Sequence, residues 1–393
     1  MRKFLALILS VSLLLSLAAC GNDNTNSSDA ANNSSTESED KTSSTTTSDV
    51  TSSDTSSQTS TNTSSKTSSK TSSKTSSKTS SKTSSTTSKQ SFLKEGTIDK
   101  ATYPKTNKDV YSNRIVRYEL NSECVGWYFT PKEPGNYQTI ILIHGQGNPY
   151  SFRDNLVYNF NKWVKEGYIE PMVVVIPEVL NTYGPTDKGS SNIDDFQYYI
   201  YEAYPKRFNT LLKSIEKGTL TSKIDTSKKP FVAGFSMGGM AALHAGADYN
   251  TRIDQVGALS PGKSFYLGDG NWGFYNYAKD IYFSTAPGAH VYLSAGRAEK
   301  DFSNIKGAFV TTINTYERGI KVNNSATLTK FIAPDSWGEH GFQLAQMEIF
   351  MFLHLAFYDA LPTNKFVETA CAQPWPSAAQ VPKVVTDPNK EHA

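Results

Sequence analysis

Residues 230–246 read PFVAGFSMGGMAALHAG, and this stretch decides the fold. An apolar run leads into a G-x-S-x-G pattern at residues 234–238, and an Ala-rich run that favours a helix follows directly. A strand, a sharp turn and a helix in this order hold one serine, here Ser236, in a strained conformation with its hydroxyl exposed. Glycine at positions 234 and 238 keeps side chains away from the crossing of strand and helix. The sequence therefore predicts a nucleophilic serine at position 236.

The order of the apolar runs predicts a mostly parallel sheet of the α/β class. Residues 139–143 and 172–177 are continuous apolar runs, which is typical of strands buried on both faces. Helical patterns separate the strands, so helices should cover both faces, and a site should lie beyond the carboxyl ends of the strands. The other predicted strands span 115–120, 125–129, 255–260, 289–294 and 326–332, and the predicted helices span 155–166, 194–214 (interrupted by Pro205) and 342–359.

A serine hydroxyl is a poor nucleophile near neutral pH and needs a base to take its proton. The chain has six histidines. His144 precedes the serine, and His244 lies on the helix that follows it. His340 lies in a Gly-flanked loop after the last predicted central strand and before the last long helix, where the order Ser, acid, His places the base. We therefore predict that His340 is the base.

A third group, an acid, must orient that histidine. The predicted strand at 289–294 ends in a turn that carries two carboxylates, Glu299 and Asp301. Glu299 stands three residues after Gly296 and Asp301 stands five after it. Spacing favours Glu299 and residue type favours Asp301, so Glu299 is preferred and Asp301 remains the alternative.

The negative oxygen of a tetrahedral intermediate needs fixed hydrogen-bond donors. One predicted donor is the backbone N–H of Met237, at the start of the helix after the serine, where the helix dipole helps. The other predicted donor is the backbone N–H of Gln146, in the loop after the strand at 139–143. His144, in the same loop, is then expected to be structural.

Aromatic residues gather in two places that should lie beside this site. The segment 265–283 is rich in aromatic residues and glycine, and it includes Trp272 and Tyr275. Trp337 lies on the same loop as His340. These three residues are candidates for a substrate pocket, since aromatic rings stack on other rings and on sugars. The alternative is a covering loop that packs on the core.

The stretches ILIHGQG, EGYIEPMVVVIPE, FVAGFSMGGMAALHAG, ALSPG and VYLSAGRAE resemble the esterase-D-like branch of the α/β-hydrolases, which contains bacterial feruloyl esterases and acetylxylan esterases. The resemblance covers about residues 135–358. It implies an α/β-hydrolase fold and a serine esterase that needs no metal or cofactor. The implied substrates are acyl esters of plant cell-wall polysaccharide, or small esters. Some relatives use Glu as the acid, which supports Glu299.

Two other functions remain open at this stage. An acyltransferase would use the same three residues and pass the acyl group to a sugar or a lipid. A non-catalytic surface protein could bind carbohydrate on a hydrolase scaffold. The complete set of serine, acid and histidine argues against the non-catalytic protein. Only an analysis of the products distinguishes the acyltransferase from a hydrolase.

The first 19 residues are predicted to be an export signal. Arg2 and Lys3 precede an apolar core at 4–17 that is too short to span a bilayer. The sequence Leu17-Ala18-Ala19-Cys20 resembles the lipobox of bacterial lipoproteins, which implies lipidation of Cys20. We therefore expect a lipid-anchored protein on the extracellular face of the bacterial envelope, with the membrane as a partner.

Composition divides the rest of the chain. Residues 20–91 are rich in Ser, Thr and Lys and are predicted to be a disordered tether, because they offer no apolar surface to bury. The catalytic domain is predicted at 92–367 and an irregular tail at 368–393. A net charge of +2 gives no indication of a nucleic-acid partner. Cys124 and Cys371 are either paired or two free buried thiols.

Overall fold

A computed structural model shows how these elements are arranged. The predicted export signal and tether lie outside its described part, as do Gln146, Tyr275 and Asp301. Within the described part, no helix combines the length and the hydropathy that a membrane span requires. The structure describes residues 96–145, 149–178, 204–262, 264–268, 271–274, 290–300, 304–322, 327–372 and 380–393.

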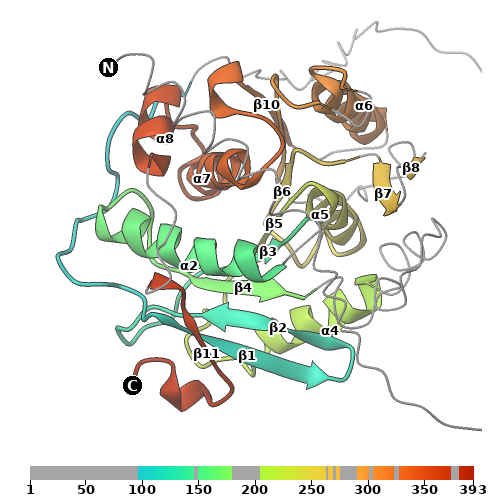
Figure 1. Ribbon diagram of the computed structural model, residues 1–393. Coiled ribbons are helices and arrows are strands. Elements are labelled where there is room, and N and C mark those ends of the chain that lie inside the picture. The colour runs from blue at the N-terminus through green and yellow to red at the C-terminus, as the bar shows by residue number, and fades with distance from the viewer. Residues whose placement is uncertain are drawn as a thin grey trace, which may run out of the picture. The chain divides into compact units, whose positions relative to one another are not determined.

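The described residues form one nine-stranded sheet in the order β10-β9-β6-β5-β3-β4-β2-β1-β11 (Figure 1). β2 is antiparallel to both of its neighbours, β1 and β4, and the other pairs are parallel. The sheet is therefore mostly parallel, as predicted. Its strands are β1 (Arg114–Asn121), β2 (Cys124–Phe129), β3 (Thr139–Ile143), β4 (Val173–Pro177), β5 (Phe231–Phe235), β6 (Gln255–Leu259), β9 (His290–Gly296), β10 (Leu328–Ala333) and β11 (Lys383–Val385).

The registers of the central strands bring their carboxyl ends to one edge of the sheet. Every residue of β3, β4 and β5 is buried, which agrees with their continuous apolar sequences. Ile143 at the end of β3 pairs with Gly234 near the end of β5. Phe235 pairs with Leu259, and Leu259 pairs with Ser294. The loops after β3, β5, β6 and β9 therefore meet at this edge.

Helices cover both faces of the sheet and bury two separate hydrophobic clusters (Figure 1). One cluster lies under α4, α5 and α6, and the other lies under α2, α7 and α8. A small antiparallel pair, β7 and β8, falls in the aromatic segment. The bounds of these elements are α2 (Pro149–Lys165), α4 (Tyr204–Glu216), α5 (Met237–Asp248), α6 (Ala308–Val322), α7 (Phe342–Tyr358), α8 (Asn364–Cys371), β7 (Ser264–Gly268) and β8 (Asn271–Phe274).

Helices α2, α4 and α6 differ from their predictions. Helix α2 begins at Pro149, before the predicted start at residue 155. The described part of the helix expected at 194–214 begins only at Tyr204, and Pro205 lies in its first turn. Proline suits that position because the N–H groups of a first turn have no partner within the helix. Helix α6 was not predicted. Its sequence is rich in β-branched residues, which weakens the helical signal.

The two cysteines do not pair. Cys124 and Cys371 are both free and buried. Cys124 belongs to the cluster under α4 and α5, whereas Cys371 belongs to the cluster under α7 and α8. The sheet separates the two sulfur atoms, so the alternative of two free thiols is the one that holds.

The prediction of an irregular tail after residue 367 is wrong. Helix α8 continues across that boundary, and Thr363 caps it by accepting a hydrogen bond from the N–H of Phe366 at 3.3 Å. β11 adds to the edge of the sheet, where Arg114 pairs with Lys383. These residues belong to the same compact unit as the sheet, Ser88–Ala393. The sequence does not predict β11, because this strand is short and mostly exposed.

Candidate active site

Ser236 lies at the turn between β5 and α5. Its φ and ψ are 59° and −120°, a conformation that is costly for a residue with a side chain. Four backbone hydrogen bonds hold it there, and the two shortest are these. Its N–H donates to the carbonyl of Leu259 at 2.9 Å, and its carbonyl accepts from the N–H of Gly239 at 3.0 Å. The structure therefore has the strand, strained turn and helix that the sequence predicts around this serine.

The crossing of β5 and α5 leaves no room for side chains at two positions. A Cβ on Gly234 would lie 2.1 Å from the carbonyl oxygen of Gly238. A Cβ on Gly238 would lie 2.2 Å from the carbonyl oxygen of Ile143. The loop after β3 also passes beside the serine, since a Cβ on Gly145 would lie 3.1 Å from the Cβ of Ser236. These close approaches explain why the turn requires glycine on both sides.

His340 lies on the loop before α7, and its ring is held between two aromatic rings. The ring centroid of Phe235 lies 4.6 Å from that of His340 at an interplanar angle of 24°. The ring of Phe309, from α6, lies on the other face of the imidazole. Because Phe235 directly precedes Ser236, this stack places the imidazole beside the serine turn. Within the described residues no hydrogen bond joins Ser236 and His340, and such bonds often tighten only when substrate binds.

Glu299 contacts His340 directly. Its side chain is fully buried, and Oε1 accepts a hydrogen bond from Nδ1 of His340 at 2.5 Å. The other oxygen, Oε2, accepts from the N–H of Gly296 at 2.5 Å and from the hydroxyl of Ser260 at 2.8 Å. The structure thus brings together the predicted base and the preferred acid. The alternative acid, Asp301, lies outside the described residues.

Met237 is the first residue of α5, directly after the serine. The N–H groups of the first helical turn have no acceptor within the helix, and the helix dipole favours a negative charge at this end. The N–H of Met237 makes no hydrogen bond within the described part of the chain. It is therefore available to an oxyanion. The second predicted donor, Gln146, lies outside the described residues.

His144 is buried in the loop after β3. Its Nδ1 lies 2.7 Å from the carbonyl oxygen of Gly145. Burial lowers the pKa of His144 to about 4, so the ring is neutral near pH 7. A neutral, buried ring agrees with the structural role that the sequence suggests for this residue.

Trp337 does not line an accessible pocket. Its side chain is fully buried, and its Nε1–H donates to Glu368 at 3.0 Å. Its ring centroid lies 5.6 Å from that of Phe331. The prediction that Trp337 forms a pocket wall is therefore wrong, since the residue anchors the loop of His340 on the core. Trp272 is part of β8, and Tyr275 lies outside the described residues.

Two residues at this site were not assigned a role from the sequence. Ser260 follows β6 with a φ of 42°, and Glu348 lies on α7 with a fully buried side chain. The hydroxyl of Ser260 lies 3.1 Å from Oε1 of Glu348. The sequence did carry a signal for Glu348, because it is the only acidic residue in an otherwise mostly apolar helix that also has no Lys or Arg.

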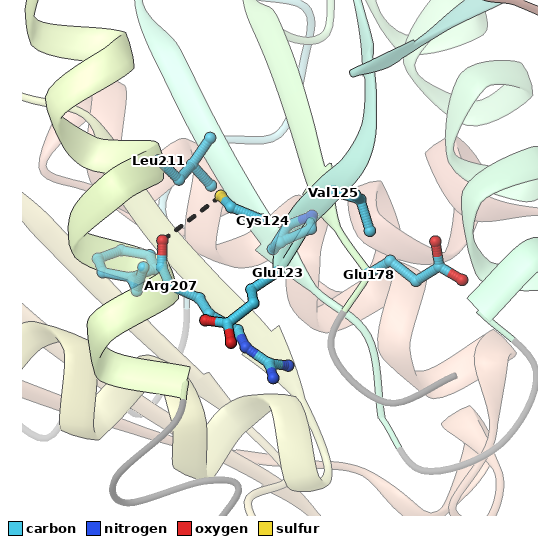
Figure 2. A pocket seen from close by; sticks show the side chains of 8 residues that line it. Glu123, Cys124, Val125, Glu178, Arg207 and Leu211 are labelled. Carbon is cyan, nitrogen blue, oxygen red and sulfur yellow. Dashed lines mark hydrogen bonds between the residues drawn. The ribbon is translucent and has the colours of Figure 1, made fainter. Parts of the chain in front are cut away.

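Figure 2 shows a separate pocket between α4 and the adjoining ends of β2 and β4. It encloses about 250 Å³, open solvent included, and none of the candidate catalytic residues lines it. The thiol of Cys124 lies 3.5 Å from the carbonyl oxygen of Arg207, and burial raises its pKa to about 11. A thiol in this state is not a nucleophile near neutral pH. The lining residues are Glu123, Cys124, Val125, Pro177, Glu178, Arg207, Phe208 and Leu211.

Comparison with known proteins identifies the family. The model of the Esterase family, whose description reads "Putative esterase", matches residues 124–351, which is more than half of the chain. The match contains the serine turn, Glu299 and His340. Comparison with curated protein sequences found no match.

Solved structures of two kinds of hydrolase are similar to this chain. The ferulic acid esterase AmCE1/Fae1A from Anaeromyces mucronatus without substrate is 17% identical, with a TM-score of 0.48 over 68% of this chain and 98% of that one. Its complex with ferulic acid is 15% identical, with a TM-score of 0.45 over 62% and 89%. A dienelactone hydrolase from Anabaena variabilis is 13% identical, with a TM-score of 0.38 over 63% and 99%.

The family match and the architecture agree with each other. The matched residues include β2 to β10 of the mostly parallel sheet and the serine turn at its carboxyl edge. The chain therefore belongs to the Esterase family, has the α/β-hydrolase fold and is a carboxylic ester hydrolase.

Proposed function

We propose that this protein is a serine esterase that removes feruloyl or acetyl groups from plant cell-wall polysaccharide such as xylan. Ser236 is the nucleophile, His340 the base and Glu299 the acid. One observation carries the assignment. Glu299 accepts a hydrogen bond from His340 at 2.5 Å, while the imidazole stacks on Phe235, the residue directly before Ser236.

In the first half of the reaction, the hydroxyl oxygen of Ser236 attacks the ester carbonyl carbon. Nε2 of His340 takes the hydroxyl proton, and Glu299 stabilises the imidazolium that forms. The backbone N–H groups of Met237 and Gln146 donate to the negative oxygen of the tetrahedral intermediate. The intermediate then expels the alcohol, which takes its proton from His340, and an acyl group remains on the serine.

Water completes the reaction. His340 takes a proton from water as the water oxygen attacks the acyl-enzyme, and the acid leaves as the serine regains its proton. These steps require no metal or cofactor. Ser236, His340 and Glu299 act through their side chains, so single substitutions test these three roles.

The substrate class rests on the resemblance of the motif stretches to feruloyl and acetylxylan esterases and on the aromatic segment at 265–283. Trp272 and Tyr275 are proposed to contact the acyl group or the sugar, because aromatic faces stack on both. Lipidation at Cys20 would anchor the protein at the outer face of the envelope. The tether proposed at 20–91 would span on the order of 45 Å root-mean-square, which would let the domain reach a polymer outside the cell.

The test uses the purified full chain and two variants. Ser236→Ala removes the proposed nucleophile, and Ser222→Ala is the matched control, because Ser222 is an exposed turn residue away from the site. Each protein is incubated with p-nitrophenyl acetate, methyl ferulate and acetylated xylan without added metal, and the products are identified. We expect release of ferulate or acetate by wild type and Ser222→Ala only.

Two outcomes would contradict the proposal. Activity that survives in Ser236→Ala would show that another residue is the nucleophile. Transfer of the acyl group to an added xylo-oligosaccharide in preference to water would show an acyltransferase. Mass mapping of a fluorophosphonate adduct locates the reactive serine independently of turnover, and we expect it on the peptide that contains Ser236.

A further inference from the structure

A second buried glutamate lies behind the proposed triad acid. Glu348 projects from α7, and Ser260 lies between it and Glu299. All three side chains are fully buried. The hydroxyl oxygen of Ser260 lies 2.8 Å from Oε2 of Glu299 and 3.1 Å from Oε1 of Glu348. One hydroxyl therefore joins two carboxyl groups in the interior.

Counting hydrogens shows that both carboxyl groups cannot be ionised in this arrangement. A serine hydroxyl has one hydrogen to donate, and an ionised carboxylate can only accept. If both glutamates were ionised, one of the two contacts to Ser260 would bring two oxygens together without a hydrogen between them. One more proton must therefore lie on a carboxyl group of the cluster.

The hydrogen-bond donors around each carboxyl group decide where that proton lies. Glu299 accepts from three donors, which are the N–H of Gly296, the hydroxyl of Ser260 and Nδ1 of His340. Among the described residues Glu348 makes one hydrogen bond, with Ser260, and its Oε2 makes none, although the hydroxyl of Ser294 also acts on its pKa. Donors stabilise the ionised form. The negative charge therefore belongs on Glu299 and the proton on Glu348.

The electrostatic environment points the same way. Burial raises the pKa of Glu348 well above its usual range, the charge of Glu299 raises it further, and the hydroxyls of Ser294 and Ser260 only partly oppose this. Tyr292 also faces the cluster, and burial and Glu348 raise the pKa of its phenol well above its usual value. Within the described residues no Lys or Arg pairs with Glu348.

We propose that Glu348 is a positioning residue, a neutral carboxylic acid that donates to Ser260 so that Ser260 donates to Glu299. The inference rests on the proposed function, in which Glu299 orients His340. A glutamate has one more rotatable bond than an aspartate, so its carboxylate needs more restraint to stay aligned with an imidazole. The chain from Glu348 through Ser260 fixes Oε2 of Glu299 and leaves Oε1 directed at Nδ1 of His340.

The backbone of Ser260 supports this role. Its φ of 42° is in the left-handed region, which is unfavourable for serine. Its N–H donates to the carbonyl of Ser294 at 2.8 Å, which holds the strained residue at the end of β6. Strained residues of this kind persist where the surrounding structure fixes them, and they cluster at functional sites.

Kinetics of two variants of the full chain test the positioning role, with p-nitrophenyl acetate as substrate. Glu348→Leu removes the donor while it fills the same space, and we expect kcat to fall on the order of tenfold with little change in KM. Glu348→Gln should restore kcat to within about threefold of wild type, because its amide N–H can donate to Ser260. Equal loss in both variants would overturn the proposal.

The pH profile separates a neutral from an ionised Glu348. Activity falls at low pH when the base becomes protonated, and a nearby negative charge would favour that protonation. If Glu348 is neutral, Glu348→Gln removes no charge and the acidic limb of kcat/KM stays in place. A shift of that limb to lower pH in Glu348→Gln would show that Glu348 is ionised in the wild type and would overturn the proposal.

An infrared measurement gives an answer that does not depend on turnover. At about pH 8.5, we expect a carboxylic acid C=O band in wild type that Glu348→Gln abolishes. Glu317→Gln is the matched control, since Glu317 is buried but pairs with Lys330 at 2.6 Å and is ionised. Absence of the band in wild type would overturn the proposal even if Ser236 proves to be the nucleophile. Conversely, failure of the Ser236→Ala test would refute the function and leave this band unaffected.

Discussion

The ring centroid of Phe309 lies 4.2 Å from the ring centroid of His340, and the two rings are stacked at an interplanar angle of 19°. With Phe235 on the opposite face, this stack confines the imidazole to its own plane. In that plane one ring nitrogen meets Glu299 and the other points away from it. Two phenylalanines from different elements therefore set the direction in which His340 can accept a proton.

Replacement of Phe309 tests the importance of this stack. We expect Phe309→Leu to lower kcat on the order of tenfold with a small change in KM, because the imidazole gains freedom to tilt. Phe357→Leu is the matched control, since Phe357 packs edge-on against Phe231 away from His340. Steady-state kinetics on p-nitrophenyl acetate measures both variants. An equal loss in the two would show a general packing effect.

Glu299→Gln tests the triad acid through the tautomer of His340. The amide oxygen would face the two donors, Gly296 and Ser260, so the amide N–H₂ would face Nδ1 of His340. Nδ1 must then accept, which moves the ring proton to Nε2, where it blocks transfer from the serine. We expect kcat to fall by about a thousandfold or more.

Glu339→Gln is the control for that measurement. Glu339 lies on the same loop as His340, but its carboxylate is exposed and pairs with Lys300 at 2.7 Å. Exposed ion pairs contribute little to stability, so this variant should keep wild-type kinetics. If Glu299→Gln keeps more than about a tenth of wild-type kcat, another carboxylate is the acid.

The free thiols have a chemical consequence. Burial raises the pKa values of both Cys124 and Cys371, so little reactive thiolate forms in the folded protein. We expect iodoacetamide at pH 8 to label both peptides only after addition of denaturant, and reducing agent to leave the melting temperature unchanged. A disulfide-linked pair of these peptides in a non-reducing digest would contradict the structure.

Glu391 should make stability depend on pH. Burial raises its pKa to about 7, although Thr130 donates to it from both the backbone N–H and the hydroxyl. An acid whose pKa is higher in the folded than in the unfolded state keeps its proton longer when folded. This contribution to stability is therefore full at low pH and is lost as pH rises from about 4.5 to about 7.

Glu391→Gln isolates that contribution, because its amide can preserve both contacts to Thr130 without a charge. The difference in melting temperature, variant minus wild type, should grow between pH 5 and pH 7.5. The variant must be compared with wild type at each pH, because His392 titrates over the same range. Burial lowers the pKa of His392 to about 4, so its titration changes stability in the opposite direction. A difference that stays constant with pH would contradict this account.

The central strands could be predicted from the sequence because their burial makes them continuous apolar runs. Residues 139–143 are a strand as predicted, and the run at 172–177 differs from β4 by one residue. The serine turn was equally clear, since only glycine fits where β5 and α5 cross. These features are local, so a single stretch of sequence contains the reason for them.

The elements that the sequence did not reveal depend on distant partners. β11 has two exposed residues and one half-buried residue, so it has no apolar pattern, and only its pairing with β1 makes it a strand. Likewise, spacing within the turn favoured Glu299. The link from Glu299 through Ser260 to Glu348 joins residues far apart in the chain, so the sequence did not reveal it. The prediction that Trp337 lines a pocket was wrong because the local sequence does not determine whether an aromatic residue on a catalytic loop faces the core or the site.

Because β1 pairs with β11, the sheet is complete only when the last residues of this sequence are present. Residues 114–116 emerge from the ribosome long before residues 383–385, their partners in the sheet. Until then β1 has an open edge, which can pair with other chains. Contacts between such distant segments form slowly. A chain in which β11 has not yet paired with β1 is therefore exposed to aggregation through this edge.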